Sequence, residues 1–183
     1  TSGYGWIIDP IDGTRAFICG RPVFGTLIGL VCDGVPIAGL IDMPMLDECY
    51  VAVGGAATMN RAPIRTSKVT ALSRARIATT SPEALKPDSL DAFNRLSAAS
   101  ATSTYGGDCH NYALLAAGHV DIVLEDGLAT HDIMGVVEVI RAAGGIVTDK
   151  TGAAVTMQGT DSLLAASTPK LHAAALALVD KSG

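Results

Sequence analysis

The chain has 183 residues, of which 49% are apolar and 17% are charged, which excludes a disordered protein and allows one sizeable core. Its net charge of −5 and its 13 scattered basic residues exclude a nucleic-acid partner, which requires clustered Lys and Arg. A membrane partner is not expected either, because no apolar run reaches the ~18 residues of a membrane span.

The first part of the chain, roughly residues 1–80, is predicted to form an antiparallel sheet. Asp33-Gly34 is typical of a two-residue hairpin turn, and the short connections imply a meander. Its first strand, Trp6–Ile8, is predicted to be buried and to stop at Asp9-Pro10. The expected strands are 6–8, 26–31, 35–41, 49–53 and 76–79.

The second part, roughly residues 81–183, alternates helices and strands. Helices are predicted at 88–98, 108–117, 132–143 and 169–179, and strands at 120–124, 146–148 and 163–166. Neither an internal repeat nor a linker interrupts the sequence, so residues 1–183 are predicted to form one domain. The pattern predicts an α/β fold built from layers, with mixed and antiparallel sheets.

The four cysteines and the first residues bear on the cellular compartment. The cysteines lack CxxC spacing, and buried thiols are favoured over the two disulfides that four cysteines allow. The first residues lack the basic and apolar segments of a signal peptide. We therefore predict a cytoplasmic protein.

The sequence DPIDGT, Asp9–Thr14, follows the first predicted strand directly. Two carboxylates three residues apart at a strand end can converge on one point, and Mg²⁺ prefers such oxygen ligands. The Ile11 carbonyl is a further candidate ligand, and the N–H groups of Gly13 and Thr14 suit a phosphate at a helix start. A simple turn is the alternative, because Asp, Pro and Gly are turn formers.

A second polar group, Thr130-His131-Asp132, opens a predicted helix that ends in Ala-Gly-Gly. Asp132 is a candidate metal ligand, although an acid at a helix start is also favoured by the helix dipole alone, by about 0.3–1 kcal/mol. His131 is either a metal ligand or, as is commoner for a lone histidine, a packing or surface residue.

These two signatures, in this order, resemble those of the inositol monophosphatase superfamily of Mg²⁺-dependent phosphatases, and the resemblance covers essentially the whole chain. It implies a layered α-β-α-β sugar-phosphatase-like fold and the hydrolysis of a small phosphate monoester with two or three Mg²⁺ ions. Relatives have Trp or Tyr at the His131 position. It also implies metal ligation by Asp9, Asp12 and Asp132, with Asp9 bridging two ions and Thr14 orienting or deprotonating the attacking water.

A narrower resemblance concerns the histidinol-phosphate phosphatase branch. It lies in Thr14-Arg15-Ala16-Phe17, in Gly20-Arg21-Pro22 and in Gly106-Gly107-Asp108-Cys109. It implies a substrate pocket lined by Arg15, Asp108 and Glu125, which suits a substrate that has an ammonium and an imidazole. A helix cap is the alternative role for Asp108, and a surface acid is the alternative for Glu125.

The resemblance also raises expectations about the start of the chain. Family members begin with helices that supply glutamates before DPIDGT, whereas nothing before Asp9 is acidic here. The chain is therefore expected to be a truncation or the ordered remainder of a longer protein, with one sheet face bare or covered by a partner. A homodimer is implied. An inositol or polyol phosphatase and a catalytically silent phosphate-binding module are the alternative functions.

Overall fold

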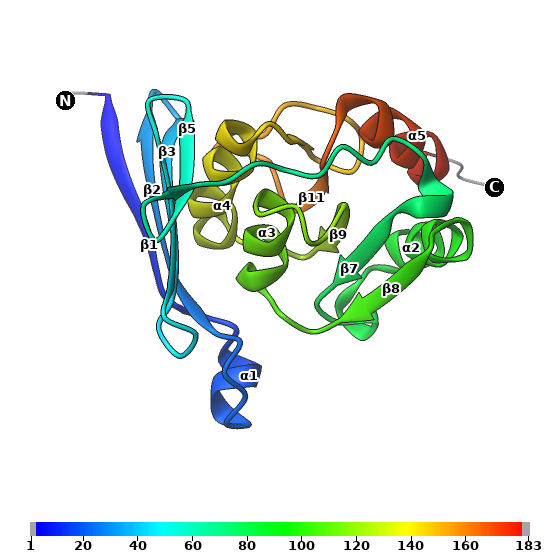
Figure 1. Cartoon of the computed structure of the whole chain (residues 1–183), viewed down its shortest axis with the longest axis horizontal. Helices are drawn as coiled ribbons and strands as arrows, with labels where there is room; N and C mark the ends of the chain where they lie inside the picture. Colours follow the sequence, from blue (N-terminus) through cyan, green and yellow to red (C-terminus); the bar gives the residue numbers. More distant parts are fainter. Residues whose placement is uncertain (1–2, 181–183) are drawn as a thin grey trace.

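The computed structural model describes residues 3–180 and arranges them in alternating layers of sheet and helix (Figure 1). A six-stranded sheet comes first, followed by α3 (Cys109–Ala116) and α4 (Thr130–Ala143). A five-stranded sheet comes next, and α2 (Pro87–Ala99) and α5 (Pro169–Val179) cover its far side. The predicted α/β fold of α-β-α-β layers with mixed and antiparallel sheets is therefore confirmed.

The first sheet is an antiparallel meander in which each strand pairs with the next. Asp33 and Gly34 form the expected hairpin turn, with φ of 49° and 79°. The sheet is wider than predicted, because two short strands follow the fourth. Its strands are β1 (Tyr4–Asp12), β2 (Gly25–Cys32), β3 (Val35–Met43), β4 (Glu48–Val53), β5 (Ala56–Met59) and β6 (Ala62–Pro63).

The first strand differs from the prediction in both length and burial. It continues through Pro10 to Asp12, which an edge strand permits because its outer N–H groups need no partner strand. It is also not buried: Trp6 is 66% exposed and Ile8 is 56% exposed. Alternate side chains of an edge strand point away from the core, and on β1 these are the large apolar ones.

The second sheet is mixed, in the order β10-β11-β9-β7-β8. Strands β8, β7 and β9 are parallel, so their carboxyl ends meet at one edge, while β11 and β10 run antiparallel. The sequence pattern missed β8, a polar edge strand. The strands are β7 (Arg76–Thr79), β8 (Thr102–Tyr105), β9 (Ile122–Asp126), β10 (Ile146–Thr148) and β11 (Ser162–Ala166), and 3₁₀ turns lie at Leu72–Arg74 and Pro82–Ala84.

Helix α4 lies between the two sheets and closes the larger apolar core. Eight of its residues are buried, among them Ile133, Val137 and Ile140. It approaches the first sheet so closely that a Cβ on Gly39 would lie 2.4 Å from the Gly135 carbonyl oxygen. Glycine at this position therefore allows α4 to lie this close to β3.

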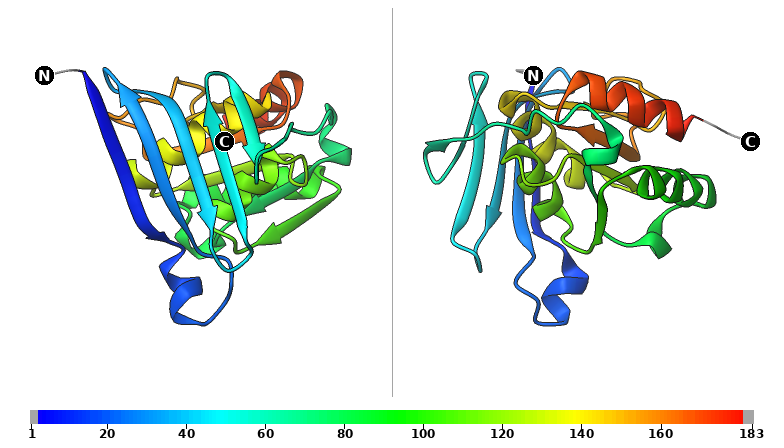
Figure 2. Two further views of the ribbon diagram at one scale, coloured as in Figure 1. Left: turned by 60° about the vertical axis from the view of Figure 1, so that its left-hand side comes forward. Right: turned by 45° about the vertical axis from the view of Figure 1, so that its right-hand side comes forward.

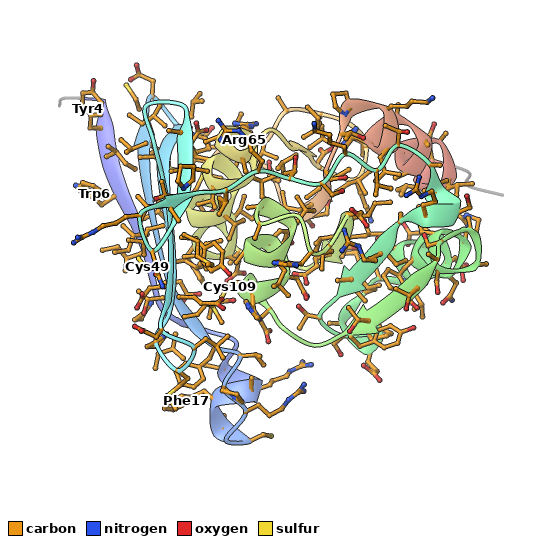
Figure 3. The ribbon with its side chains drawn as sticks, in the orientation of Figure 1. Tyr4, Trp6, Phe17, Cys49, Arg65 and Cys109 are labelled. Atoms are coloured by element: carbon orange, nitrogen blue, oxygen red, sulfur yellow. The ribbon has the colours of Figure 1, made fainter. Side chains whose placement is uncertain are left out.

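The opposite face of the first sheet is not covered by any helix among residues 3–180 (Figure 2). Figure 3 shows Tyr4 and Trp6 on the side of β1 that faces away from the helices. Two rows of mainly apolar side chains cross this outer face: Trp6, Leu30, Ala38 and Val53, and Ile8, Ile28, Leu40 and Val51.

The cysteines match the prediction only in part. All four are free, but only Cys109 is buried, whereas Cys19 is exposed and Cys32 and Cys49 are half-buried. The expectation of buried thiols was therefore wrong for three of them, because Cys32 and Cys49 lie on the outer face of the first sheet and Cys19 follows the short helix α1 (Thr14–Ile18). Within the described residues, no helix has the length and apolar character to cross a membrane.

Candidate active site

A β-bulge in β1 brings the two aspartates of DPIDGT to the same face of the sheet. Residues three apart on a regular strand point to opposite faces. Here Asp9 pairs with Leu27 and Asp12 pairs with Gly25, so the register shifts by one residue between them. The hydroxyl of Thr26 donates to the Pro10 carbonyl oxygen at 2.9 Å and holds the bulge. Both aspartates thus face the helices, and Asp9 is buried.

The start of α4 lies opposite this bulge. The Nε2 atom of His131 is 3.6 Å from Asp132 Oδ1 and 4.0 Å from Asp9 Oδ2. Each of these three residues offers one ligand atom, and the three atoms lie within 4.8 Å of one another. A predicted metal ligand of DPIDGT and one of α4 therefore meet, although 122 residues of chain lie between them.

Asp12 lies beside this group and lines an adjoining cavity of about 200 Å³. Its Oδ2 accepts a hydrogen bond of 2.6 Å from the Cys109 N–H. Burial raises the pKa of Asp12, and the charges of Asp132 and Asp9 raise it further. Of the predicted site residues, the cavity is lined by Asp12, Gly13, Thr14, Arg15, Asp108, Glu125 and Asp132; Asp9 and Ile11 lie outside its lining.

Asp108 precedes α3 and does not act as a helix cap, because its side chain makes no capping hydrogen bond. Its backbone has φ of 46°, which is unusual for a residue with a side chain. Burial and the nearby Asp12 raise its pKa to about 6, while Arg15 and Arg21 oppose the increase. The carboxyl group therefore belongs to the cavity and not to the helix end.

Glu125 is buried near the end of β9, which contradicts the alternative of a surface acid. It accepts hydrogen bonds from the Thr80 N–H at 3.0 Å and from the Tyr112 hydroxyl at 3.2 Å. Burial is the main reason that its pKa rises to about 7. It lies at the edge where the carboxyl ends of β7, β8 and β9 meet, the usual place for ligands in parallel sheets.

The residues after the bulge form α1 (Thr14–Ile18), which protrudes from the body of the molecule (Figure 1). Gly13 precedes the helix with φ of 82°, and a Cβ there would lie 3.0 Å from the Val23 carbonyl oxygen and 3.2 Å from Asp108 Oδ2. Only glycine fits this conformation and this space without a shift of its neighbours. Thr14 and Arg15 then line the cavity, as predicted for substrate-binding residues.

The charges in this region are predominantly negative. Five carboxyl groups line the cavity, and Arg15 is the only basic residue among its lining residues. Burial is the largest cause of the raised pKa values of Asp12, Asp108, Glu125 and Asp132, and repulsion by neighbouring carboxylates raises each of them further. A cluster of carboxylates of this kind attracts cations and repels a phosphate that has no cation beside it.

Comparison with known proteins identifies the family of this chain. A model of the inositol monophosphatase family matches residues 1–183. The chain belongs to this family. The resemblance stated from the two signatures is thus confirmed.

The relatives that match this chain include proteins named histidinol-phosphatases and proteins named inositol monophosphatases. The bifunctional chloroplastic phosphatase IMPL2 of Arabidopsis thaliana is 44% identical, over 91% of the chain and 49% of the relative. The histidinol-phosphatase of Chlorobaculum parvum is 34% identical, over 82% and 59% respectively. The inositol-1-monophosphatase ImpA of Mycolicibacterium smegmatis is 32% identical, over 97% and 67%. The chain therefore spans about half to two thirds of the length of these relatives.

A solved structure gives the same fold assignment. An inositol monophosphatase from Zymomonas mobilis superposes with a TM-score of 0.94 at 38% identity, over 97% of the chain and 71% of that structure.

Some residues of the site in this family member were not singled out from the sequence. Thr80 and Tyr112 hold Glu125, and no sequence pattern marks them. Asp126 is a buried acid whose partners are distant in the sequence: it accepts a hydrogen bond from Ser89 and forms ion pairs with Lys86 and Lys150. Asp126 directly follows Glu125, so a charged strand end of this kind was a usable signal.

Proposed function

We propose that this chain hydrolyses a small phosphate monoester with the help of Mg²⁺, and that the ester is histidinol phosphate. The main support is that Asp108 and Glu125 face the same cavity in addition to the carboxylates assigned to metal. Histidinol phosphate carries an ammonium and an imidazole, which pair favourably with two acidic groups. An inositol phosphate offers only hydroxyl groups beyond its phosphate, and hydroxyl groups do not require two acidic groups, one half-buried and one buried.

The donor set fits Mg²⁺, because Asp9, Asp12 and Asp132 supply hard carboxylate oxygens and Ile11 a carbonyl oxygen. We propose that these residues hold two or three ions. When bound, the ions neutralise phosphate charge and lower the pKa of a coordinated water. They would also relieve the repulsion among these carboxylates.

The remaining residues are proposed to position the substrate. The hydroxyl of Thr14 is proposed to orient the attacking water and to take its proton as it passes its own hydroxyl proton to a carboxylate, for which Asp9 is the proposed acceptor. Gly13 and Thr14 offer backbone N–H groups to the phosphate, and Arg15 adds the single positive charge of the cavity lining. Asp108 and Glu125 bind the cationic end of the ester, and the Thr80 and Tyr112 hydrogen bonds keep Glu125 in place.

Because the pKa values of Asp108 and Glu125 are raised, the affinity for the cationic end of the substrate should depend on pH. Asp108 titrates at about 6 and Glu125 at about 7, so both carry less charge at pH 5 than at pH 8. Attraction of the substrate ammonium therefore rises across this range, whereas the substrate imidazole loses its charge around its ordinary pKa of about 6.5 and contributes less above it.

One alternative substrate is supported by a specific observation. Relatives named inositol monophosphatases match almost as well as histidinol-phosphatases, which favours an inositol or polyol phosphate as the second candidate substrate. A catalytically silent phosphate-binding module stays a prediction, which metal-dependent release of phosphate would contradict. The homodimer and the cytoplasmic location stay predictions.

The test compares Asp108→Asn with the unaltered chain on two substrates. Loss of a charge-assisted hydrogen bond costs about 1.5–3 kcal/mol, so KM for histidinol phosphate should rise roughly 10- to 100-fold. KM for inositol 1-phosphate should change little. Asp91→Asn, which alters an exposed carboxylate on α2, is the matched control and should affect neither substrate. An equal loss on both substrates would remove the case for histidinol phosphate.

A further inference from the structure

We propose that His131 is a nitrogen ligand of one metal ion, which it binds together with Asp9 and Asp132. This ion site is expected to take Mn²⁺, Co²⁺ or Zn²⁺ more tightly than Mg²⁺. The inference rests on the metal-dependent function proposed above and adds to it a residue and a metal preference. Asp12 and the Ile11 carbonyl remain available for a second ion with oxygen ligands only.

The distances suit a shared ion. Around an ion with bonds of about 2.1 Å, two ligand atoms lie about 3.0 Å apart in neighbouring positions and about 4.2 Å apart in opposite ones. The Nε2 atom of His131 is 3.6 Å from Asp132 Oδ1 and 4.0 Å from Asp9 Oδ2. Both distances fall inside this range, and both exceed a hydrogen bond.

The orientation of the two carboxylates is an independent observation. The Oδ1 atom of Asp9 accepts a hydrogen bond of 3.0 Å from the Ile11 N–H. The Oδ2 atom of Asp132 accepts one of 2.7 Å from the Ala129 N–H. In each case the other oxygen is the one that faces the His131 ring. These local hydrogen bonds, one of which is the capping-box bond at the start of α4, hold each carboxylate with its second oxygen on the His131 side, within the 4.8 Å group.

Simpler roles for His131 explain less. Its side chain is 54% exposed, so it is not a packing residue. An ion pair with the two aspartates at 3.6 Å and 4.0 Å would add little stability at an exposed position. Metal ligation accounts for the position of the ring beside both carboxylates.

The chemistry of the three donors sets the expected preference. Imidazole binds Mn²⁺, Co²⁺ and Zn²⁺ well, whereas Mg²⁺ favours sites made of oxygens alone. A site with one nitrogen and two carboxylates should therefore follow the usual order of divalent affinities, with Mn²⁺ below Co²⁺ and Zn²⁺. Removal of the imidazole should therefore weaken the binding of these three ions far more than the binding of Mg²⁺.

The test measures Mn²⁺ binding directly and does not depend on turnover. Calorimetry gives the affinity for Mn²⁺ and for Mg²⁺, and pulsed electron paramagnetic resonance of bound Mn²⁺ detects a coordinated ¹⁴N nucleus. The variants are His131→Gln and the control His119→Gln, which alters an exposed histidine near the far end of α3. Matching melting temperatures of the metal-free proteins would show that both variants fold.

We expect a ¹⁴N signal in the unaltered chain and in His119→Gln, and its loss in His131→Gln. Mn²⁺ affinity should fall by roughly 10- to 100-fold in His131→Gln, with a change below about threefold for Mg²⁺. Bound Mn²⁺ without a ¹⁴N signal, or with one that persists in His131→Gln, would overturn the role of His131 and leave a carboxylate site intact. If the unaltered chain bound no Mn²⁺ at millimolar concentration, this inference and the proposed metal site would both be wrong.

Discussion

Glu125 is expected to make the stability of the metal-free chain depend on pH. Its pKa is about 7 in the folded chain, against 4.5 for an ordinary glutamate. Between these values the unfolded chain has lost the proton and the folded chain still binds it, so stability falls as pH rises through this window. Each pH unit between the two pKa values lowers the free energy of unfolding by about 1.36 kcal/mol, so the total decrease is about 3 kcal/mol. The decrease is complete just above pH 7.

The substitution Glu125→Gln removes this dependence. Glutamine is neutral at every pH, and its amide oxygen can still accept the Thr80 hydrogen bond. The variant should match the unaltered chain near pH 5 and exceed its stability at pH 8. For a chain of this size, about 3 kcal/mol corresponds to roughly 6–12 °C in melting temperature. Part of this effect comes from Asp12 and Asp108, whose charges contribute to the raised pKa of Glu125.

The assay is thermal melting in a chelator at pH 5 and pH 8, followed by circular dichroism. Asp91→Asn serves as the control, since its carboxylate is exposed on α2. The reasoning predicts that the difference between Glu125→Gln and the unaltered chain grows with pH, while the control difference stays constant. If the difference for Glu125→Gln were the same at both pH values, Glu125 would not be a buried acid with a raised pKa.

Two further predictions concern packing. Gly39→Ala should lower the free energy of unfolding by about 1–3 kcal/mol, because its Cβ would lie 2.4 Å from the Gly135 carbonyl oxygen and push α4 away from the sheet. The control is Gly5→Ala, whose Cβ would have an ordinary contact of 3.4 Å, and its melting temperature should be close to that of the unaltered chain. The uncovered outer sheet face should make the chain self-associate, since exposed apolar patches of several hundred Å² are unusual in monomers. Trp6→Lys should lower the mass that light scattering measures for the unaltered chain. The control is Met45→Lys, which alters a similarly exposed side chain at a turn and should leave the mass unchanged. A monomeric unaltered chain would contradict this expectation.

The sequence predicted the elements whose stability is local or periodic. The hairpin at Asp33-Gly34, the helix of α4 and the helix start after Gly13 follow from turn chemistry and from apolar spacing. The candidate residues Asp9 and Asp132 came from their chemistry and from the family resemblance, and they meet in the structure.

The features that were missed depend on contacts between distant segments. The bulge that brings Asp9 and Asp12 to one face is set by pairing with β2, and the sequence around Pro10 reads as a strand end. Burial of Glu125 depends on Thr80 and Tyr112, which come from two other elements. The approach of His131 to Asp9 depends on the close contact of α4 with the sheet, which no local pattern reveals.

The most direct test of the proposed function is a side-by-side assay of phosphate release from histidinol phosphate and from inositol 1-phosphate in the presence of Mg²⁺. The account predicts turnover of both that disappears with a chelator, with kcat/KM at least tenfold higher for histidinol phosphate, as expected from about 1.4 kcal/mol of differential binding by Asp108 and Glu125. Equal values, or a preference for inositol 1-phosphate, would contradict the substrate assignment. Failure to release phosphate from either ester would contradict the account as a whole.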